Sequence, residues 1–373
     1  MKILFFSAFY YPHVGGQEKF VQKLSESLVQ NKHSVDIITN NTNQVSSMEN
    51  LNGVTIYRVK CANLLDGRFP IPIITDFYRV VSKIRKTKYD LIVTNTRFFP
   101  LSLLGNLWAR KNKFRVLHIE HGTRHVVTSS NFTNFIGELY DHIVGRYIFS
   151  CSHHVAAVSK AAQQFVQHIK DREIVYLPNC TDTSYFRQVK SSLRSQFKIR
   201  RNNLVVTYVG RLTYAKGVQD LLLALKNEPH ISMIIVGKGE YEQELQKISK
   251  QAIFVGEKKE DEVREILSIT DIFVNPSYSE GLPTSVLEAG SMKIPVIATD
   301  VGGTKEILTG RCRDLLIQPQ NPKKIRRTVQ KLRQAKVREE YGKELQRKIQ
   351  TQFSWDTANK ILGDILQHGN ISH

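Results

Sequence analysis

The chain is poor in cysteine and has no long apolar run. Its 373 residues include four widely spaced cysteines without a Cys-x-x-Cys pair. This pattern argues against a zinc site or a disulfide framework and suits a reducing cytoplasm. No apolar run reaches the roughly 18 residues that a membrane-spanning helix needs. The short N-terminal run Ile3–Ala8 lacks a cleavage site, so we expect a buried first strand rather than a signal peptide.

Acidic residues are scarce relative to basic ones. The sequence has 53 Lys and Arg against 34 Asp and Glu, which gives a formal net charge of +19. The segment from Arg79 to Arg124 contains eleven basic and two acidic residues, and the segment from Lys323 to Lys348 contains eleven basic and three acidic residues. Such an excess implies an anionic partner: nucleic acid, an anionic membrane surface or an acidic substrate. Neither run has zinc-finger spacing or an aromatic RNA-binding pattern, so we expect no nucleic acid.

Strand-like and helical segments alternate along the chain. Helices are expected, for example, at Glu18–Gln30 and Thr75–Thr87. Strands are expected at Ile3–Ala8, Val35–Thr39, Val54–Val59, Leu91–Asn95, Val116–Glu120, Val155–Ser159, Leu204–Gly210, Ser232–Gly237, Ile253–Val255, Ile272–Pro276 and Pro295–Thr299. This alternation predicts an α/β fold with two Rossmann-like domains. The turn-rich junction Tyr176–Ser184 separates domains at 1–178 and 190–350, and Ser354 caps a final helix at 354–373.

Two carboxylates, Glu280 and Glu288, flank a predicted helix start. Gly281 provides flexibility, and Pro283 is expected at an early helical position. The free N–H groups and the dipole of a helix start attract anions, above all phosphate. Because helical residues are about 100° apart, the two glutamates cannot share one face. We expect Glu280 in the loop and Glu288 about one turn inside the helix; the alternative is a surface helix with two solvated acids.

Three other motifs follow predicted strands, at the carboxyl ends where open parallel sheets bind ligands. Gly15 and Gly16 let the backbone approach a phosphate without a Cβ in the way. Arg211 and Lys216 could neutralise a diphosphate. His121 follows the strand that ends at Glu120. Each motif has a plainer alternative. Gly15 and Gly16 could form an ordinary turn, Arg211 and Lys216 a solvated basic loop, and His121 could be a structural histidine.

No Asp-x-Asp pair occurs anywhere in the chain. A metal-bound diphosphate usually needs such a pair, because Mg²⁺ and Mn²⁺ prefer carboxylate oxygens. Arg211, Lys216 and the helix start could balance the same charge. We therefore expect neither a metal ion nor another cofactor.

Taken together, these motifs resemble the retaining glycosyltransferases of family 4, also described as glycosyl transferases group 1. The resemblance runs along nearly the whole chain. It is strongest in an ordered set of segments: Gly210-Arg-x4-Lys-Gly217, Val236–Gly239, Asp271–Ser277, Glu280-x7-Glu288, Pro295–Gly303 and Glu306. It implies a GT-B fold, with two facing Rossmann-like, doubly wound parallel-sheet domains. The first would bind the acceptor, the second the nucleotide-sugar, and the C-terminal helix would cross back to the first.

The resemblance also implies roles for the site residues. Gly16, beside Gly15, would place its N–H on the donor diphosphate, which Arg211 and Lys216 would hold as the sugar leaves. His121 would lie beside the donor sugar. The remaining donor contacts would be Glu280 on the sugar hydroxyls, Glu288 on the ribose, and the N–H groups of Gly281, Leu282 and Thr284 near the distal phosphate.

The implied reaction moves a hexose from a nucleotide-sugar, UDP-linked first and GDP-linked second, with retention of configuration. The leaving phosphate helps to take the acceptor proton, so catalysis rests on positioning and charge stabilisation. The acceptor would be a saccharide or a lipid-linked molecule in polysaccharide, lipopolysaccharide or glycolipid synthesis. The alternatives are a GT-B nucleotide-sugar epimerase, a non-catalytic nucleotide-binding scaffold and, from charge alone, a nucleic-acid binder.

Apolar and basic residues interleave from Ile71 to Lys86. Together with Trp108–Arg115, this segment predicts a peripheral contact with the inner face of the cytoplasmic membrane; the alternative is a helix packed on its sheet.

Two positions depart from the family pattern. Cys180 replaces a common glycine at the junction, and 289–293 replaces a more usual Ala-Met-Ala-x-Gly run.

Overall fold

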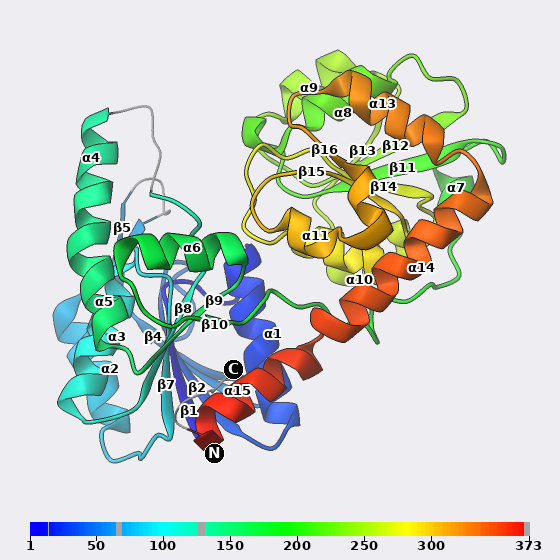
Figure 1. Ribbon diagram of the computed structural model, residues 1–373. Helices are drawn as coiled ribbons and strands as arrows, with labels where there is room; N and C mark the ends of the chain where they lie inside the picture. Colours follow the sequence, from blue (N-terminus) through cyan, green and yellow to red (C-terminus); the bar gives the residue numbers. More distant parts are fainter. Residues whose placement is uncertain (14, 65–68, 126–130, 369–373) are drawn as a thin grey trace. The chain divides into compact units, whose positions relative to one another are not determined.

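The computed structural model describes residues 1–13, 15–64, 69–125 and 131–368. They form two compact units (Figure 1). The first comprises Met1–Asn179 and Trp355–His373, and the second comprises Cys180–Ser354. Within the described ranges, no helix has both the length and the apolar composition required to cross a bilayer.

The first unit is built on a sheet that has eight strands in the described residues, in the order β10-β9-β8-β7-β1-β2-β4-β3. Neighbouring strands are parallel, except that β3 runs antiparallel to β4. The strands are β1 (Lys2–Ser7), β2 (Ser34–Asn40), β3 (Met48–Leu51), β4 (Val54–Val59), β7 (Leu91–Asn95), β8 (Val116–Glu120), β9 (His154–Ala157) and β10 (Val175–Tyr176). A separate antiparallel pair consists of β5 (Cys61–Leu64) and β6 (Phe69–Pro72).

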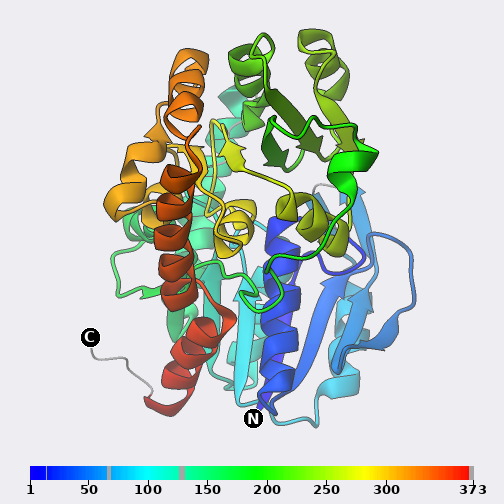
Figure 2. The same cartoon turned by 90° about the vertical axis from the view of Figure 1, so that its right-hand side faces the viewer.

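Helices cover both faces of this sheet, which is why β1 is apolar along its length. They are α1 (Gly16–Gln30), α2 (Ile74–Ile84), α3 (Pro100–Lys111), α4 (Asn131–Tyr140), the π-helix η1 (Asp141–Gly145), α5 (Arg146–Cys151), α6 (Lys160–Ile169) and α15 (Trp355–His368). α1 and α15 lie side by side, on the face opposite α2 and α3 (Figures 1 and 2). The rings of Phe20 and Trp355 are 5.6 Å apart, and Asn359 donates to the Ser27 hydroxyl at 2.6 Å.

The second unit contains a fully parallel sheet, six-stranded in the described residues, with the order β13-β12-β11-β14-β15-β16. Its strands are β11 (Leu204–Val209), β12 (Ile231–Val236), β13 (Ile253–Gly256), β14 (Ile272–Asn275), β15 (Val296–Thr299) and β16 (Leu316–Ile317). Its helices are α7 (Leu193–Gln196), η2 (Tyr214–Lys216), α8 (Val218–Leu225), α9 (Glu242–Ile248), α10 (Glu260–Ser268), α11 (Thr284–Ser291), α12 (Thr304–Ile307), η3 (Gly310–Leu315), α13 (Pro322–Lys331) and α14 (Ala335–Gln352).

The predicted α/β class is confirmed, and the long apolar strands are where the sequence placed them. One local prediction is wrong. Pro283 is the N-cap of α11, with extended backbone, and the helix begins one residue later at Thr284. A proline at the N-cap still fits, because the fixed φ of its ring suits an extended residue that leads into a helix. Glu280 lies in the loop and Glu288 one turn inside α11, as expected.

The two departures from the family pattern have different structural consequences. Cys180 is buried and is not among the residues with positive φ, so no strained backbone replaces the usual glycine. Lys293, in contrast, has φ +62°, the left-handed conformation that glycine adopts without a Cβ penalty. Behind Glu288, α11 packs on α14 through Gly290, where an added Cβ would lie 2.4 Å from a methyl group of Ile349.

Candidate functional site

In the second unit, the predicted site residues meet at the carboxyl ends of β11, β14 and β15, which are neighbours in the sheet. The Lys216 ammonium, after β11, forms an ion pair with the Glu280 carboxylate, after β14, at 2.7 Å. Their side chains are 22% and 11% exposed. A pair that is largely buried but still open on one side can exchange partners with an anionic ligand. The sheet order thus joins two residues 64 positions apart in the sequence.

Two glycines of the loop after β15 fix the position of Glu280. Gly302 has φ +54°, and an added Cβ would lie 1.9 Å from the Glu280 carbonyl oxygen. The Gly303 N–H donates to the Gly281 carbonyl at 2.6 Å. The backbones therefore approach more closely than any side chain would allow. Glu280 is held by this contact between loops rather than by a helix.

The Lys216 loop is braced in the same way. Gly217 has φ +65°, and a Cβ there would lie 2.0 Å from the Pro276 carbonyl oxygen. The Tyr278 N–H donates to the Ala215 carbonyl at 2.8 Å. Lys216 and Glu280 are consequently positioned by one rigid set of backbone contacts after β11 and β14.

Arg211 is the most open cation of this cluster. Its side chain is exposed and has no hydrogen bond or ion pair to the part of the chain that the structure describes. Its backbone is anchored, because the Tyr208 hydroxyl donates to the Arg211 carbonyl at 3.0 Å. Burial, and then the nearby Glu280 carboxylate, raise the pKa of Tyr208, so this hydroxyl remains a neutral donor. The Arg211 guanidinium is therefore available to an anion.

The start of α11 completes the cluster. The first N–H groups of a helix have no intrahelical acceptor, and Pro283 offers no side chain to cap them. Thr284, the first residue of α11, is half-buried, whereas Leu282 and Glu288 are only 3% and 5% exposed. Leu282 thus anchors the loop in the core, while the helix start offers donors for an anion.

In the first unit, the glycine pair and His121 come together around α1. Gly15 is the N-cap of α1 and Gly16 its first residue. A Cβ added to Gly16 would meet no described atom within 4 Å, so packing does not demand a glycine there. One turn later, the Phe20 ring contacts the His121 ring edge-on at 5.2 Å. The open space at Gly16 is room that a ligand can fill.

His121 is neutral at physiological pH. Burial lowers the pKa of His121 to about 4, against the opposing effect of Glu120. Its Nε2 atom is buried and has no hydrogen-bond partner among the residues that the structure describes. A neutral imidazole with a free ring nitrogen can donate or accept one hydrogen bond but is a weak base.

Sequence reasoning missed a buried charge network at the carboxyl end of β8. Arg97 pairs with Glu120 at 3.0 Å and with Asp141 at 2.9 Å, and both carboxylates are fully buried. Burial would raise the pKa of Glu120, but Arg97, then His118 and the Gly122 N–H, hold it at about 2. The partners are 23 and 44 residues apart along the chain, and no local spacing signals such a contact.

The predicted membrane segment divides into a buried and an exposed part. Phe77, Val81 and Ile84 of α2 belong to the core, as in the alternative of a helix packed on its sheet. Trp108 is also a core residue, with its ring 5.9 Å from the Phe6 ring, so it offers no membrane anchor. Apolar residues just before α2 and in its first turns remain exposed: Ile71, Ile73, Ile74 and Tyr78.

Comparison with known proteins decides the family. Residues 189–349 match the family described as Glycosyl transferases group 1, and residues 14–185 match Glycosyltransferase Family 4. The two matches together span nearly the whole chain. The chain is a family 4 glycosyltransferase.

Relatives and solved structures agree with this assignment. An uncharacterized glycosyltransferase of Methanocaldococcus jannaschii is 27% identical to the chain, over 96% of both proteins. The alpha-monoglucosyldiacylglycerol synthase of Streptococcus pneumoniae is 25% identical, over 80% of this chain and 71% of its own. The structure of HepE from Anabaena in complex with UDP-glucose superposes with a TM-score of 0.76 at 19% identity, over 98% and 99% of the two chains. The glycosyltransferase thus has the GT-B fold that its motifs predicted.

Proposed function

We propose that this glycosyltransferase transfers a hexose from a UDP-sugar to a saccharide or lipid-linked acceptor, with retention of configuration and without a metal ion. The observation that carries the proposal is the cluster of Arg211, Lys216, Glu280 and the start of α11 at one edge of the second sheet. One open guanidinium, one ammonium and one helix start match the charge of a diphosphate.

The ion pair between Lys216 and Glu280 suggests how donor binding rearranges the site. A diphosphate offers Lys216 a stronger partner than a single carboxylate, since it carries more negative charge. Once Lys216 turns to the phosphates, the Glu280 oxygens can accept hydrogen bonds from sugar hydroxyls. Glu288, buried one turn inside α11, is our proposed acceptor for the ribose hydroxyls.

The weak basicity of the candidate residues in each unit favours a mechanism in which the leaving phosphate itself takes the acceptor proton. Glu280 is ion-paired with Lys216, which weakens it as a base or nucleophile. His121, with a pKa of about 4, binds protons weakly at neutral pH. A retaining, front-face transfer needs no dedicated protein base, and it rests on charge stabilisation by Arg211 and Lys216.

The same cations support the proposal that no metal is needed for transfer. In place of acidic metal ligands, the cluster offers two positive side chains and a helix start. The UDP preference rests on the fold shared with HepE, which binds UDP-glucose. The lipid-linked acceptor rests on the relative named alpha-monoglucosyldiacylglycerol synthase.

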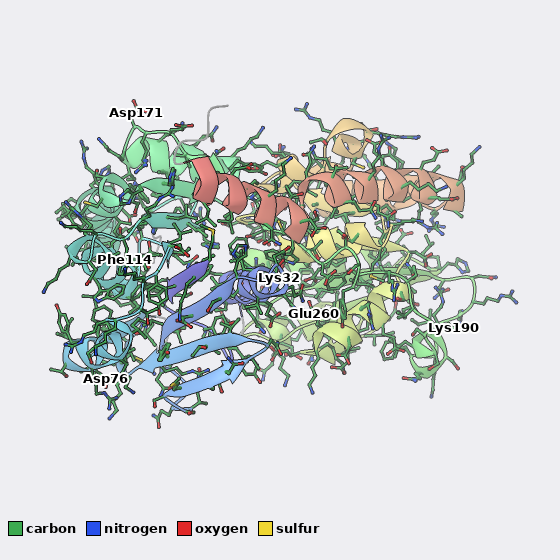
Figure 3. The ribbon with its side chains drawn as sticks, turned by 90° about the horizontal axis from the view of Figure 1, so that it is seen from below. Lys32, Asp76, Phe114, Asp171, Lys190 and Glu260 are labelled. Atoms are coloured by element: carbon green, nitrogen blue, oxygen red, sulfur yellow. The ribbon has the colours of Figure 1, made fainter. Side chains whose placement is uncertain are left out.

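A peripheral membrane contact through the start of α2 suits such an acceptor. Ile73, Ile74 and Tyr78 are 44–59% exposed, and Arg79 and Lys83 follow on the exposed side of the helix. Asp76, labelled in Figure 3, is buried and pairs with Arg79. Co-sedimentation should show more protein on anionic than on neutral liposomes, and less after Ile74→Glu. Equal recovery on both vesicle types would contradict the electrostatic contact.

The nucleotide can be identified by thermal stability with UDP, GDP or ADP, each in EDTA. A ligand at about a hundred times its dissociation constant adds roughly 2.7 kcal/mol, which shifts the melting temperature by several degrees. We expect UDP to stabilise the protein selectively and Glu288→Ala to abolish the effect. Stabilisation by GDP alone would identify a GDP-sugar as the donor. If no nucleotide shifts the melting temperature, the assignment of the donor site is wrong.

Activity variants test the roles of the charged residues. Arg211→Ala and Glu280→Ala should each remove most transfer or donor hydrolysis and leave the fold intact. Arg201→Ala is the matched control, because Arg201 is exposed just before β11 whereas Arg211 follows it. Near-normal turnover in Arg211→Ala, or an equal loss in Arg201→Ala, would contradict the assignment.

A further inference from the structure

Three histidines from separate segments of the first unit meet on one side of its sheet. His125 follows β8, His142 lies in the π-helix η1 and His168 lies in α6. One ring nitrogen of each lies within 4.8 Å of the others, and the ring centroids are 5.5–5.9 Å apart. In Figure 1, one end of α6 lies near α4 and α5, which continue into and out of η1, and α6 contacts η1. π-Helical turns are rare and occur frequently at functional sites.

A buried carboxylate fixes the orientation of His125. The His125 Nδ1 and an Asp141 oxygen are 2.8 Å apart, and Asp141 is fully buried. Because a carboxylate accepts, the proton lies on Nδ1 and the lone pair of the neutral ring lies on Nε2. That Nε2 atom is buried and has no hydrogen-bond partner in the described part of the chain. A histidine that holds Nδ1 on a carboxylate and leaves Nε2 without a described partner has the arrangement of a metal ligand.

The surrounding charge favours a cation. Two buried carboxylates, Glu120 and Asp141, share a single guanidinium, that of Arg97. His118 and His125 also contact these carboxylates, and each adds a positive charge only if it is protonated. With neutral imidazoles, a divalent ion beside Asp141 offsets the carboxylate charge that Arg97 leaves unbalanced.

We propose that His125, His142 and His168 bind a divalent transition-metal ion, with Zn²⁺ as the expected ion. Imidazole nitrogens bind Zn²⁺ at about 2.0–2.1 Å in tetrahedral geometry, which places the nitrogens about 3.4 Å apart. From separations of at most 4.8 Å, no pair has to close by more than about 1.4 Å, which rotation of the rings achieves. His168 is exposed, so a water molecule can fill the fourth position from solvent.

The ion joins the segment after β8 to η1 and to α6, three elements that no disulfide ties together. The three histidines belong to the first unit, whereas the cations proposed to hold the donor belong to the second. The proposal of metal-independent transfer concerns those cations, so a bound Zn²⁺ in the first unit is compatible with it.

The test is Zn²⁺ binding to tag-free, metal-stripped protein, measured by competition with a chromophoric chelator. We expect one Zn²⁺ per chain and a melting temperature that rises with added ZnCl₂. His142→Ala and His168→Ala should each weaken binding by more than the roughly 10–100-fold that loss of an outer-shell partner costs. His33→Ala, also in the first unit but away from the cluster, should bind normally.

Folding of each variant is checked by its melting temperature in EDTA, which should equal that of the stripped wild type. His168 is exposed, so its truncation leaves the core unchanged. No Zn²⁺ binding by the wild type, or undiminished stoichiometric binding by both His142→Ala and His168→Ala, would overturn the proposal. Loss of UDP stabilisation would bear on the donor site and leave this result unaffected.

Discussion

Replacing Gly302 by alanine should inactivate the enzyme through the backbone of Glu280. The added Cβ would lie 1.9 Å from the Glu280 carbonyl oxygen, whereas real Cβ contacts essentially never fall below 3.0 Å. The two loops must therefore separate by at least 1.1 Å, the difference between these distances. A misplacement of about 1 Å can cost about 100-fold in rate. We expect donor hydrolysis, followed as nucleotide release, to fall by about that factor.

Gly310→Ala provides a matched control in the same unit. Gly310 has φ +55°, nearly the φ of +54° at Gly302, so both variants carry the same left-handed penalty of about 1–2 kcal/mol. At Gly310, however, the Cβ meets only the end of the Glu344 side chain, at 2.5 Å, which can turn away. Both variants should lose stability through this penalty, and Gly302→Ala should lose more because its Cβ also clashes with backbone, but only Gly302→Ala should lose most activity. Equal activity in the two variants would refute the role of this contact between loops.

Three further results are expected. Gly16→Ala should leave the melting temperature nearly unchanged, because the added Cβ meets no described atom within 4 Å. It should weaken stabilisation by UDP, because we propose that the start of α1 binds phosphate. Folding lowers the pKa of Glu120 from 4.5 to about 2, and this shift corresponds to about 3 kcal/mol of stability. The stabilisation is present above pH 4.5 and is lost as the pH falls towards 2. Urea unfolding at pH 7 and pH 2 measures this contribution. Arg97→Met should cost about 3–5 kcal/mol at pH 7, whereas Arg110→Met, at an exposed site, should cost little. Lys293→Gly should raise the free energy of unfolding by about 1 kcal/mol, since it relieves a left-handed lysine, and a loss of stability would contradict that account.

The sequence predicted the elements that bury long apolar runs. Val54–Val59, Leu91–Asn95 and Val116–Glu120 have the predicted bounds. The last two begin with apolar residues and end in polar ones, whereas Val54–Val59 begins with alternating buried and half-buried positions. The short edge strands β10 and β16, with two residues each, carry too few residues to form a pattern. The antiparallel pair of β5 and β6 was missed for a similar reason, since each strand has four residues, β5 is mostly exposed and β6 contains two prolines.

The sequence placed candidate residues at strand ends but did not indicate contacts between distant segments. Glu280 and Lys216 were each expected after a strand, and the order of the sheet brings them into an ion pair because β11 and β14 are neighbours. Arg97 precedes α3 without any motif, and its two carboxylate partners lie in β8 and η1. The scarcity of cysteine argued against a zinc site. The sequence alone does not show that His125, His142 and His168, from three separate segments, lie together.

The helix α15 gives the chain an unusual order of assembly during synthesis. Its side chains complete the surface of α1, through Trp355 on Phe20 and Asn359 on Ser27, and Arg115 donates to the carbonyls of Ile365 and Leu366. The first unit to leave the ribosome therefore lacks one of its helices until residues 355–368, which follow the second unit, are made. The second unit is contiguous, from Cys180 to Ser354, and holds all of its own strands before that point. The half of the molecule that is translated first is thus the half that is finished last.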